Sequence, residues 1–186
     1  MHFNYRAPMQ AEPEFYVVSK RKLAILFLAT SSLYVLYWYY KNWDRYKSRH
    51  PEASQFGSMV SPVPRAVFWM FFTHALFRKV KACGHALPQV AGWRSGWHAT
   101  FLVALMLPAN AIDVLIGGTA GDLVSLASVF VLLPPFLMAQ DKINLSCGDP
   151  EGKGNDRLSR ANWAWVIAGG VLWLILIAAA LLPGGS

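Results

Sequence analysis

The sequence predicts an all-α, polytopic membrane protein with three to four spanning helices and one short interfacial helix. Three observations lead to this prediction. The 186 residues are 55% hydrophobic, long uncharged apolar runs recur along the chain, and the Lys and Arg residues flank these runs. The bases form no separate basic domain. The net charge of +7 therefore indicates contacts with a membrane surface, and no nucleic-acid partner is expected.

A polar lead, residues 1–19, precedes the first apolar run and is predicted to be irregular because it contains Pro8 and Pro13. The run itself, 23–40, carries no charge. As a helix it would be about 27 Å long, close to the hydrocarbon thickness of a bilayer. It ends in bulky aromatics rather than at a small-residue cleavage site, so we expect an uncleaved anchor.

Aromatic residues crowd the far end of this run. Rings with one polar edge collect at the headgroup level of a bilayer, which predicts an aromatic belt here. The expected interfacial anchors are Tyr37, Trp38, Tyr40 and Trp43.

A second uncharged stretch, 66–77, completes a unit that extends from residue 20 to residue 96. As a helix it would be only about 18 Å long, which is too short to span. Basic side chains follow it at helical spacing, and this pattern predicts a short interfacial amphipathic helix. Whether 23–40 and 66–77 span or lie at the surface stays open, and with it the side of the N-terminus.

The C-terminal unit, 97–186, is predicted to be a transmembrane hairpin followed by a transmembrane helix. The segments 97–116 and 123–138 flank a tight, glycine-rich turn, and 163–182 is a run of twenty apolar residues. Small residues on the last helix form a predicted packing or partner-binding face. They are Ala164, Ala168, Gly169 and Gly170.

The distribution of Lys and Arg predicts the orientation of this unit. The hairpin turn and the C-terminal tail contain no Lys or Arg, whereas the loop 141–160 contains four. Because basic loops stay on the cytoplasmic side, this loop is predicted to be cytoplasmic and the C-terminus to be on the other side of the membrane.

One polar pair inside the hairpin is a candidate functional site. Asn110 and Asp113 lie one helical turn apart, and intramembrane carboxylates often mark proton or ion paths. The favoured interpretation is structural, because Asp113 lies four residues from Gly117 and can cap or pair locally at the outer interface.

The remaining motifs do not predict catalysis. Cys83, His85 and the other histidines match no common metal-ligand spacing, and 149–156 lacks the ligands of an EF-hand loop. The sequence also has no phosphate-binding glycine loop and no nucleophile elbow. We therefore expect a non-enzymatic protein with no cofactor and no metal.

Three blocks of the N-terminal half resemble a family of small, uncharacterised inner-membrane proteins of Gram-negative bacteria. The blocks are 15–23 (FYVVSKRKL), 33–43 (LYVLYWYYKNW) and 62–77. The resemblance implies a location in the inner membrane of a Gram-negative bacterium. Together with the apolar runs and the charge distribution, we expect a multi-pass protein with a periplasmic C-terminus. It implies no activity.

In size and helix number, the whole chain is also similar to polytopic immunity proteins that protect bacteria from pore-forming toxins. The expected function is therefore the binding and neutralisation of such a toxin in the membrane. The alternative is a small oligomeric transporter or lipid-handling protein that uses Asp113 and Asn110. The lipid bilayer is an expected partner in both cases, together with a toxin or further copies of the chain.

Overall fold

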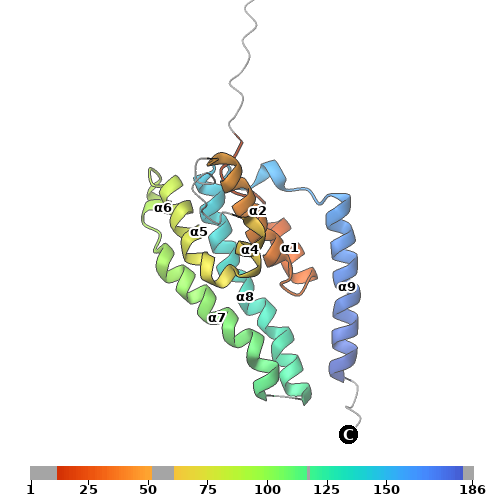
Figure 1. The fold of residues 1–186 in the computed structure, drawn as a ribbon. Coiled ribbons are helices and arrows are strands. Elements are labelled where there is room, and N and C mark those ends of the chain that lie inside the picture. Colours follow the sequence, from red (N-terminus) through yellow and green to blue (C-terminus); the bar gives the residue numbers. More distant parts are fainter. Residues whose placement is uncertain (1–11, 52–60, 117, 182–186) are drawn as a thin grey trace, which may run out of the picture.

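A computed structural model of the protein describes residues 12–51, 61–116 and 118–181, of which 108–116, 119–120, 122–123, 125–126 and 179–181 are described by their backbone alone. All regular structure in these residues is helical, which confirms the predicted all-α class for them (Figure 1). The helices are α1 (Lys20–Ala29), α2 (Tyr34–Arg49), α4 (Pro62–Val67), α5 (Trp69–Cys83), α6 (Pro88–Ala91), α7 (Ser95–Ile116), α8 (Gly118–Ser146), the 3-10 helix η1 (Lys153–Asn155) and α9 (Arg160–Leu181).

The first apolar run is broken between α1 and α2, so the prediction of one continuous anchor over 23–40 is wrong. Ser31 and Ser32 have φ angles of 48° and 70°, in the left-handed region that no helix continues through. The hydroxyl of Thr30 donates to a carbonyl of α1 at 2.8 Å and accepts from the first N–H of α2 at 2.9 Å. These side-chain bonds replace the helical ladder at the break. A ten-residue α1 is only about 15 Å long and cannot cross a bilayer.

The aromatic belt is also corrected. Trp38 and Trp43 are fully buried in the core, so neither can reach lipid headgroups. The indole N–H of Trp38 donates to a side chain of α8, and the guanidinium of Arg65 lies 4.2 Å from the ring centre of Trp43. Tyr37 is 46% exposed and Tyr40 is half-buried, so these two remain accessible.

The second apolar segment forms α4 and α5, which break apart at Phe68. One face of α5 packs into the bundle through Leu76, Phe77 and Val80, all fully buried. The opposite face exposes Phe71 together with the polar side chains His74 and Arg78. The buried face of α5 packs inside the bundle, and the placement of the helix at a membrane interface stays a prediction.

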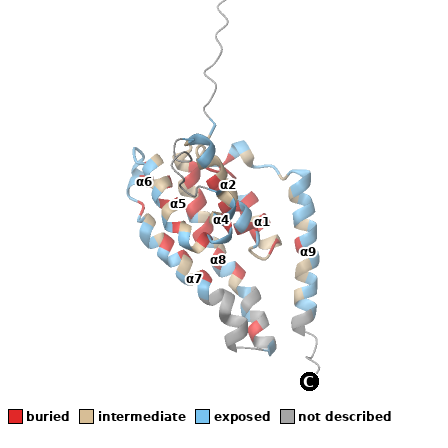
Figure 2. Ribbon diagram, in the orientation of Figure 1, coloured by how far each residue is buried: buried red, intermediate tan, exposed pale blue. Residues whose placement is uncertain are grey.

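The α7–α8 hairpin and α9 extend away from this bundle in the same direction (Figure 1). Most of α9 is exposed, whereas buried residues gather in α1, α2, α5 and α8 (Figure 2). Among the described residues, one helix is long and apolar enough to cross a membrane, namely the segment Arg160–Ala178 of α9. The multi-pass topology is therefore not confirmed by helix length and composition.

Candidate functional site

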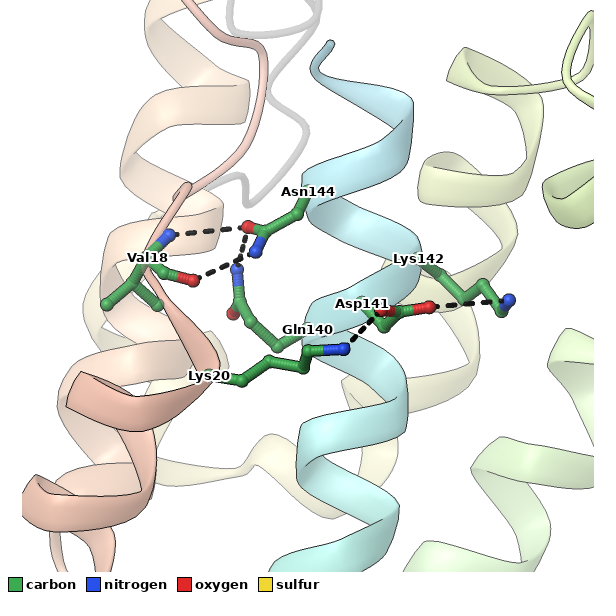
Figure 3. Close-up of polar contacts among 6 residues, drawn as sticks. All are labelled: Val18, Lys20, Gln140, Asp141, Lys142 and Asn144. Atoms are coloured by element: carbon green, nitrogen blue, oxygen red, sulfur yellow. Dashed lines mark hydrogen bonds and ion pairs between the residues drawn. The ribbon is translucent and has the colours of Figure 1, made fainter. Parts of the chain in front are cut away.

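An extended segment, residues 15–18, lies buried between α2 and α8, and we call it the inserted segment. Its backbone has no strand partner and is bonded by side-chain amides instead. The N–H of Tyr16 donates to Oδ1 of Asn42 at 3.1 Å, and the Tyr16 carbonyl accepts from Nε2 of Gln140 at 3.0 Å. Asn144 bonds both backbone groups of Val18, at 3.4 Å to the N–H and 3.0 Å to the carbonyl (Figure 3).

Gln140 connects these contacts into one network. Its Oε1 accepts from Nε1 of Trp38 at 2.6 Å, and its Nε2 also donates to Oδ1 of Asn144 at 2.7 Å. Each of these side chains is buried and hydrogen-bonded. A satisfied buried network fixes one packing arrangement, so the polar residues of α8 hold the inserted segment in place.

The loop between α8 and α9 closes over the inserted segment. Nδ2 of Asn155 donates to the carbonyl of Val17 at 2.9 Å. Gly152 has φ 68°, and a Cβ there would lie 2.5 Å from backbone atoms of Val18 and Ser19. Glycine therefore permits this close approach, which brings residues more than a hundred positions apart into one wall.

This wall borders a groove of about 900 Å³ between α2, the loop and the start of α9. We call it the polar groove. It is lined by Glu12, Pro13, Tyr16, Val17, Lys22, Tyr37, Lys41, Arg45, Cys147, Gly148, Asp149, Gly154, Asn155, Ser159 and Asn162.

Lys22 is the most buried cation of the polar groove, with 5% of its surface exposed. Its Nζ donates to Oδ1 of Asn155 at 2.6 Å and to the carbonyl of Arg157 at 2.8 Å, and both acceptors are neutral. Burial lowers the pKa of Lys22, and the nearby carboxylate of Asp156 opposes this shift.

The other two cations come from α2. Nζ of Lys41 lies 3.0 Å from a carboxylate oxygen of Asp44, one turn away on the same helix. Arg45 makes no hydrogen bond or ion pair with any residue that the structure describes. With Tyr37, these residues follow one face of α2 at a spacing of four.

The carboxylates of the polar groove are partly engaged elsewhere. Asp149 accepts from the backbone N–H groups of Lys153 and Gly154 at 3.0 and 2.8 Å, which fixes its side chain within its own loop. Glu12 lies 3.8 Å from Arg49, beyond the groove lining. The lining of the polar groove thus holds three cations and two carboxylates, which leaves one positive charge in excess.

A second groove of about 460 Å³ adjoins the polar groove and is predominantly apolar. We call it the apolar groove. The two share Tyr37, Ser159 and Asn162 in their linings. The remaining lining residues of the apolar groove are Thr30, Leu33, Tyr34, Leu36, Ala161 and Trp165. Both volumes fall within or near the range of about 300–1,000 Å³ typical of small-molecule sites.

The predicted polar pair is not part of these grooves. Asn110 and Asp113 belong to α7, but their side chains lie outside the described residues. Their predicted role as an intramembrane site therefore stays a prediction.

The four residues of the predicted small-residue face differ in burial: one is buried and three are exposed. Gly169 is buried, and a Cβ there would collide with the backbone carbonyl of Ala29. Beside this contact, Nε1 of Trp173 donates to the carbonyl of Leu28 at 2.7 Å. Gly169 thus docks α9 against the end of α1. The other three small residues, Ala164, Ala168 and Gly170, remain exposed.

Across the part of the chain that the structure describes, no group of three His, Cys, Asp or Glu side chains could hold a metal ion. No family model, curated protein or solved structure matches the chain. The resemblance of the N-terminal blocks to inner-membrane proteins therefore stays a prediction.

The cationic residues of the polar groove were not predicted from the sequence, although one signal was present. Tyr37, Lys41 and Arg45 recur every four residues, which places them on one helix face. Tyr37 was instead interpreted as part of an aromatic belt. Lys22 carried no comparable signal, because its burial depends on a loop more than 130 residues away.

Proposed function

We propose that this chain is a non-enzymatic lipid-binding protein of the bacterial inner membrane, and that its joined grooves hold a lipid. The main observation behind this proposal is that the polar groove and the apolar groove adjoin each other. They share Tyr37, Ser159 and Asn162 in their linings, and the polar groove also contains three cations. A lipid has the matching division into a polar head and an apolar tail.

The location of the grooves at the start of α9 supports this proposal. Trp163 and Trp165 are exposed in the first turns of α9, where aromatic residues of a spanning helix meet the membrane interface. Ser159, Asn162 and Trp165 line the grooves at this same end. With α9 in the bilayer, the polar groove therefore lies at the level of the lipid headgroups.

We further propose that the α7–α8 hairpin spans the membrane together with α9. The hairpin tip and the C-terminal end of α9 point the same way (Figure 1). Large apolar side chains are exposed along both helices of the hairpin. Among them are Trp97, Phe101, Leu107, Phe130, Val131 and Met138. In this multi-pass arrangement the loop between α8 and α9 is cytoplasmic and the C-terminus periplasmic, so the grooves open on the cytoplasmic side.

The chemistry of the lining favours binding over catalysis. Burial raises the pKa of the Cys147 thiol, which disfavours the nucleophilic thiolate. The hydroxyl of Ser159 bonds the side-chain oxygen of Asn162 at 3.1 Å and accepts from its backbone N–H, so it serves to start α9. Cations and hydroxyls of this kind hold a ligand without transforming it.

The proposal can be tested by filling the apolar groove. Ala161 lines this groove and is exposed, so Ala161→Trp adds bulk there without disturbing the core. Ala164→Trp, at an exposed position of α9 outside both linings, is the matched control. After purification in mild detergent, native mass spectrometry should find lipid bound to the wild type and the control and strongly reduced in Ala161→Trp. Absence of lipid from the wild type, even after added lipid, would refute the proposal.

A second candidate function is the neutralisation of a pore-forming toxin, and exposed small residues on α9 favour it. Ala164, Ala168 and Gly170 allow a partner helix to approach closely in lipid. Ala168→Leu combined with Gly170→Leu should then abolish protection in growth competition against toxin-bearing siblings, with membrane potential followed by a voltage-sensitive dye. A deletion strain that keeps fitness and potential against every toxin-bearing competitor contradicts this candidate.

A further inference from the structure

We infer that the joined grooves select membrane lipids with an anionic headgroup, which Lys22, Lys41 and Arg45 bind. This inference rests on the proposed lipid-binding function and names its ligand class. Three features of the grooves carry it: their direction along α2, their charge balance, and their continuity.

The face of α2 sets the direction of the bound lipid. Leu33 and Leu36, at the start of the helix, line the apolar groove. Tyr37 follows and lines both grooves, and Lys41 and Arg45 continue the same face into the polar groove. A ligand lying along this face meets apolar side chains first and cations last. Its tail therefore lies beside the start of α2, and its head lies one to two turns further on.

The charge balance favours a ligand with net negative charge. Arg45 has no ion pair among the described residues, and Lys22 donates only to neutral acceptors, with Asp156 acting on it at longer range. The pair between Lys41 and Asp44 is partly exposed, and such pairs contribute little. These cations can therefore turn to a ligand. Guanidinium groups bind phosphate oxygens in a bidentate manner, and ammonium groups add compact positive charge.

Continuity of the two grooves distinguishes a lipid from a free anion. Inorganic phosphate would use only the cationic end and would leave the apolar groove unused. A zwitterionic lipid could fill the apolar groove, but its own ammonium group would lie near the lysines and the arginine. An anionic lipid fits both grooves, because its acyl chains fill the apolar groove and its negative charge complements the cations of the polar groove.

The test compares headgroups of different charge on identical acyl chains. Delipidated full-length protein in mild detergent is titrated with phosphatidylglycerol, with phosphatidylcholine and with inorganic phosphate, and binding is followed by native mass spectrometry. We expect phosphatidylglycerol to bind at least about tenfold more tightly than phosphatidylcholine, a ratio that one charge-assisted hydrogen bond can supply. Inorganic phosphate should neither bind detectably nor displace phosphatidylglycerol at millimolar concentration.

Variants on α2 assign the selectivity to the groove. Arg45→Gln should lower the affinity for phosphatidylglycerol about tenfold and leave that for phosphatidylcholine unchanged. Arg45→Lys should restore part of the loss. Lys47→Gln removes an exposed positive charge two residues further along the same helix, outside the lining, and is the matched control.

Three outcomes would overturn the inference, and they separate it from the proposed function. Equal affinity for the two lipids would remove the headgroup selectivity and leave lipid binding intact. Displacement of phosphatidylglycerol by inorganic phosphate would identify a free-anion site. Equal effects of Arg45→Gln and Lys47→Gln would indicate general surface charge. Failure of both lipids to bind would instead refute the proposed function itself.

Discussion

Removing the Asn144 side chain should destabilise the protein more than any exposed amide substitution. Asn144→Ala deletes both hydrogen-bond partners of the Val18 backbone and one of the bonds that Gln140 makes. Val18 is fully buried, so its N–H and carbonyl would lose their partners away from water. Each such group costs about 1–3 kcal/mol, which predicts a total loss of about 2–6 kcal/mol in the free energy of unfolding. This is a large part of the about 5–15 kcal/mol that stabilises a typical domain.

Two measurements check this magnitude. Denaturant unfolding in mild detergent, followed by tryptophan fluorescence, gives the loss of stability, and hydrogen exchange reports local opening at the Val18 amide. Gln89→Ala removes an exposed amide and is the matched control, expected to change stability by less than about 0.5 kcal/mol. A stability of Asn144→Ala equal to that of this control, with a Val18 amide that exchanges as slowly as in the wild type, would contradict the prediction.

Three further predictions follow from other contacts. Gly169→Leu should lower the free energy of unfolding by about 1–3 kcal/mol because its Cβ meets backbone of α1, whereas Gly170→Leu, with open space around it, should be neutral in the same unfolding assay. Burial, reinforced by a nearby carboxylate, raises the pKa of Cys83 to about 12, so below that pH its thiol stays protonated. Iodoacetamide at pH 8 should therefore label Cys83 about 1,000-fold more slowly than an unperturbed cysteine, and the rate should rise with pH. Mass spectrometry of the modified peptide measures this rate, and labelling as fast as that of an unperturbed cysteine would contradict the prediction. Reporter fusions after Ser186 should be periplasmic and fusions near Gly152 cytoplasmic, and the reverse pattern would contradict the proposed orientation.

The all-α fold class and the position of the last helix could be predicted from composition and from the length of the apolar runs alone. The apolar run 163–182 closely matches the Arg160–Leu181 helix, because an apolar helix of that length depends little on distant contacts. The break at Thr30 could not be predicted in this way. Its Ser and Thr residues carry no charge, so they left the run apparently continuous.

The incorrect prediction of an aromatic belt shows that composition alone cannot tell whether an aromatic residue faces lipid or the protein core. Trp38 suits lipid and a protein core equally well, because both are apolar surroundings with a few hydrogen-bond acceptors at hand. Its true position depends on Gln140, which lies 102 residues further along the chain. The grooves depend on similar long-range pairs, such as Lys22 with Asn155. Spacing within one helix reveals a shared face, and it cannot reveal which distant loop covers that face.

The inserted segment also constrains how the chain is made. It is synthesised well before its partners Gln140, Asn144 and Asn155, which follow 124 to 138 residues later. At a synthesis rate of about 5–20 residues per second, roughly 6–28 seconds pass before these amides exist. During that interval the segment has to stay solvated or be sheltered by a chaperone. Chains that stop before α8 lack Gln140 and Asn144 and therefore cannot bond the backbone of the inserted segment in this way.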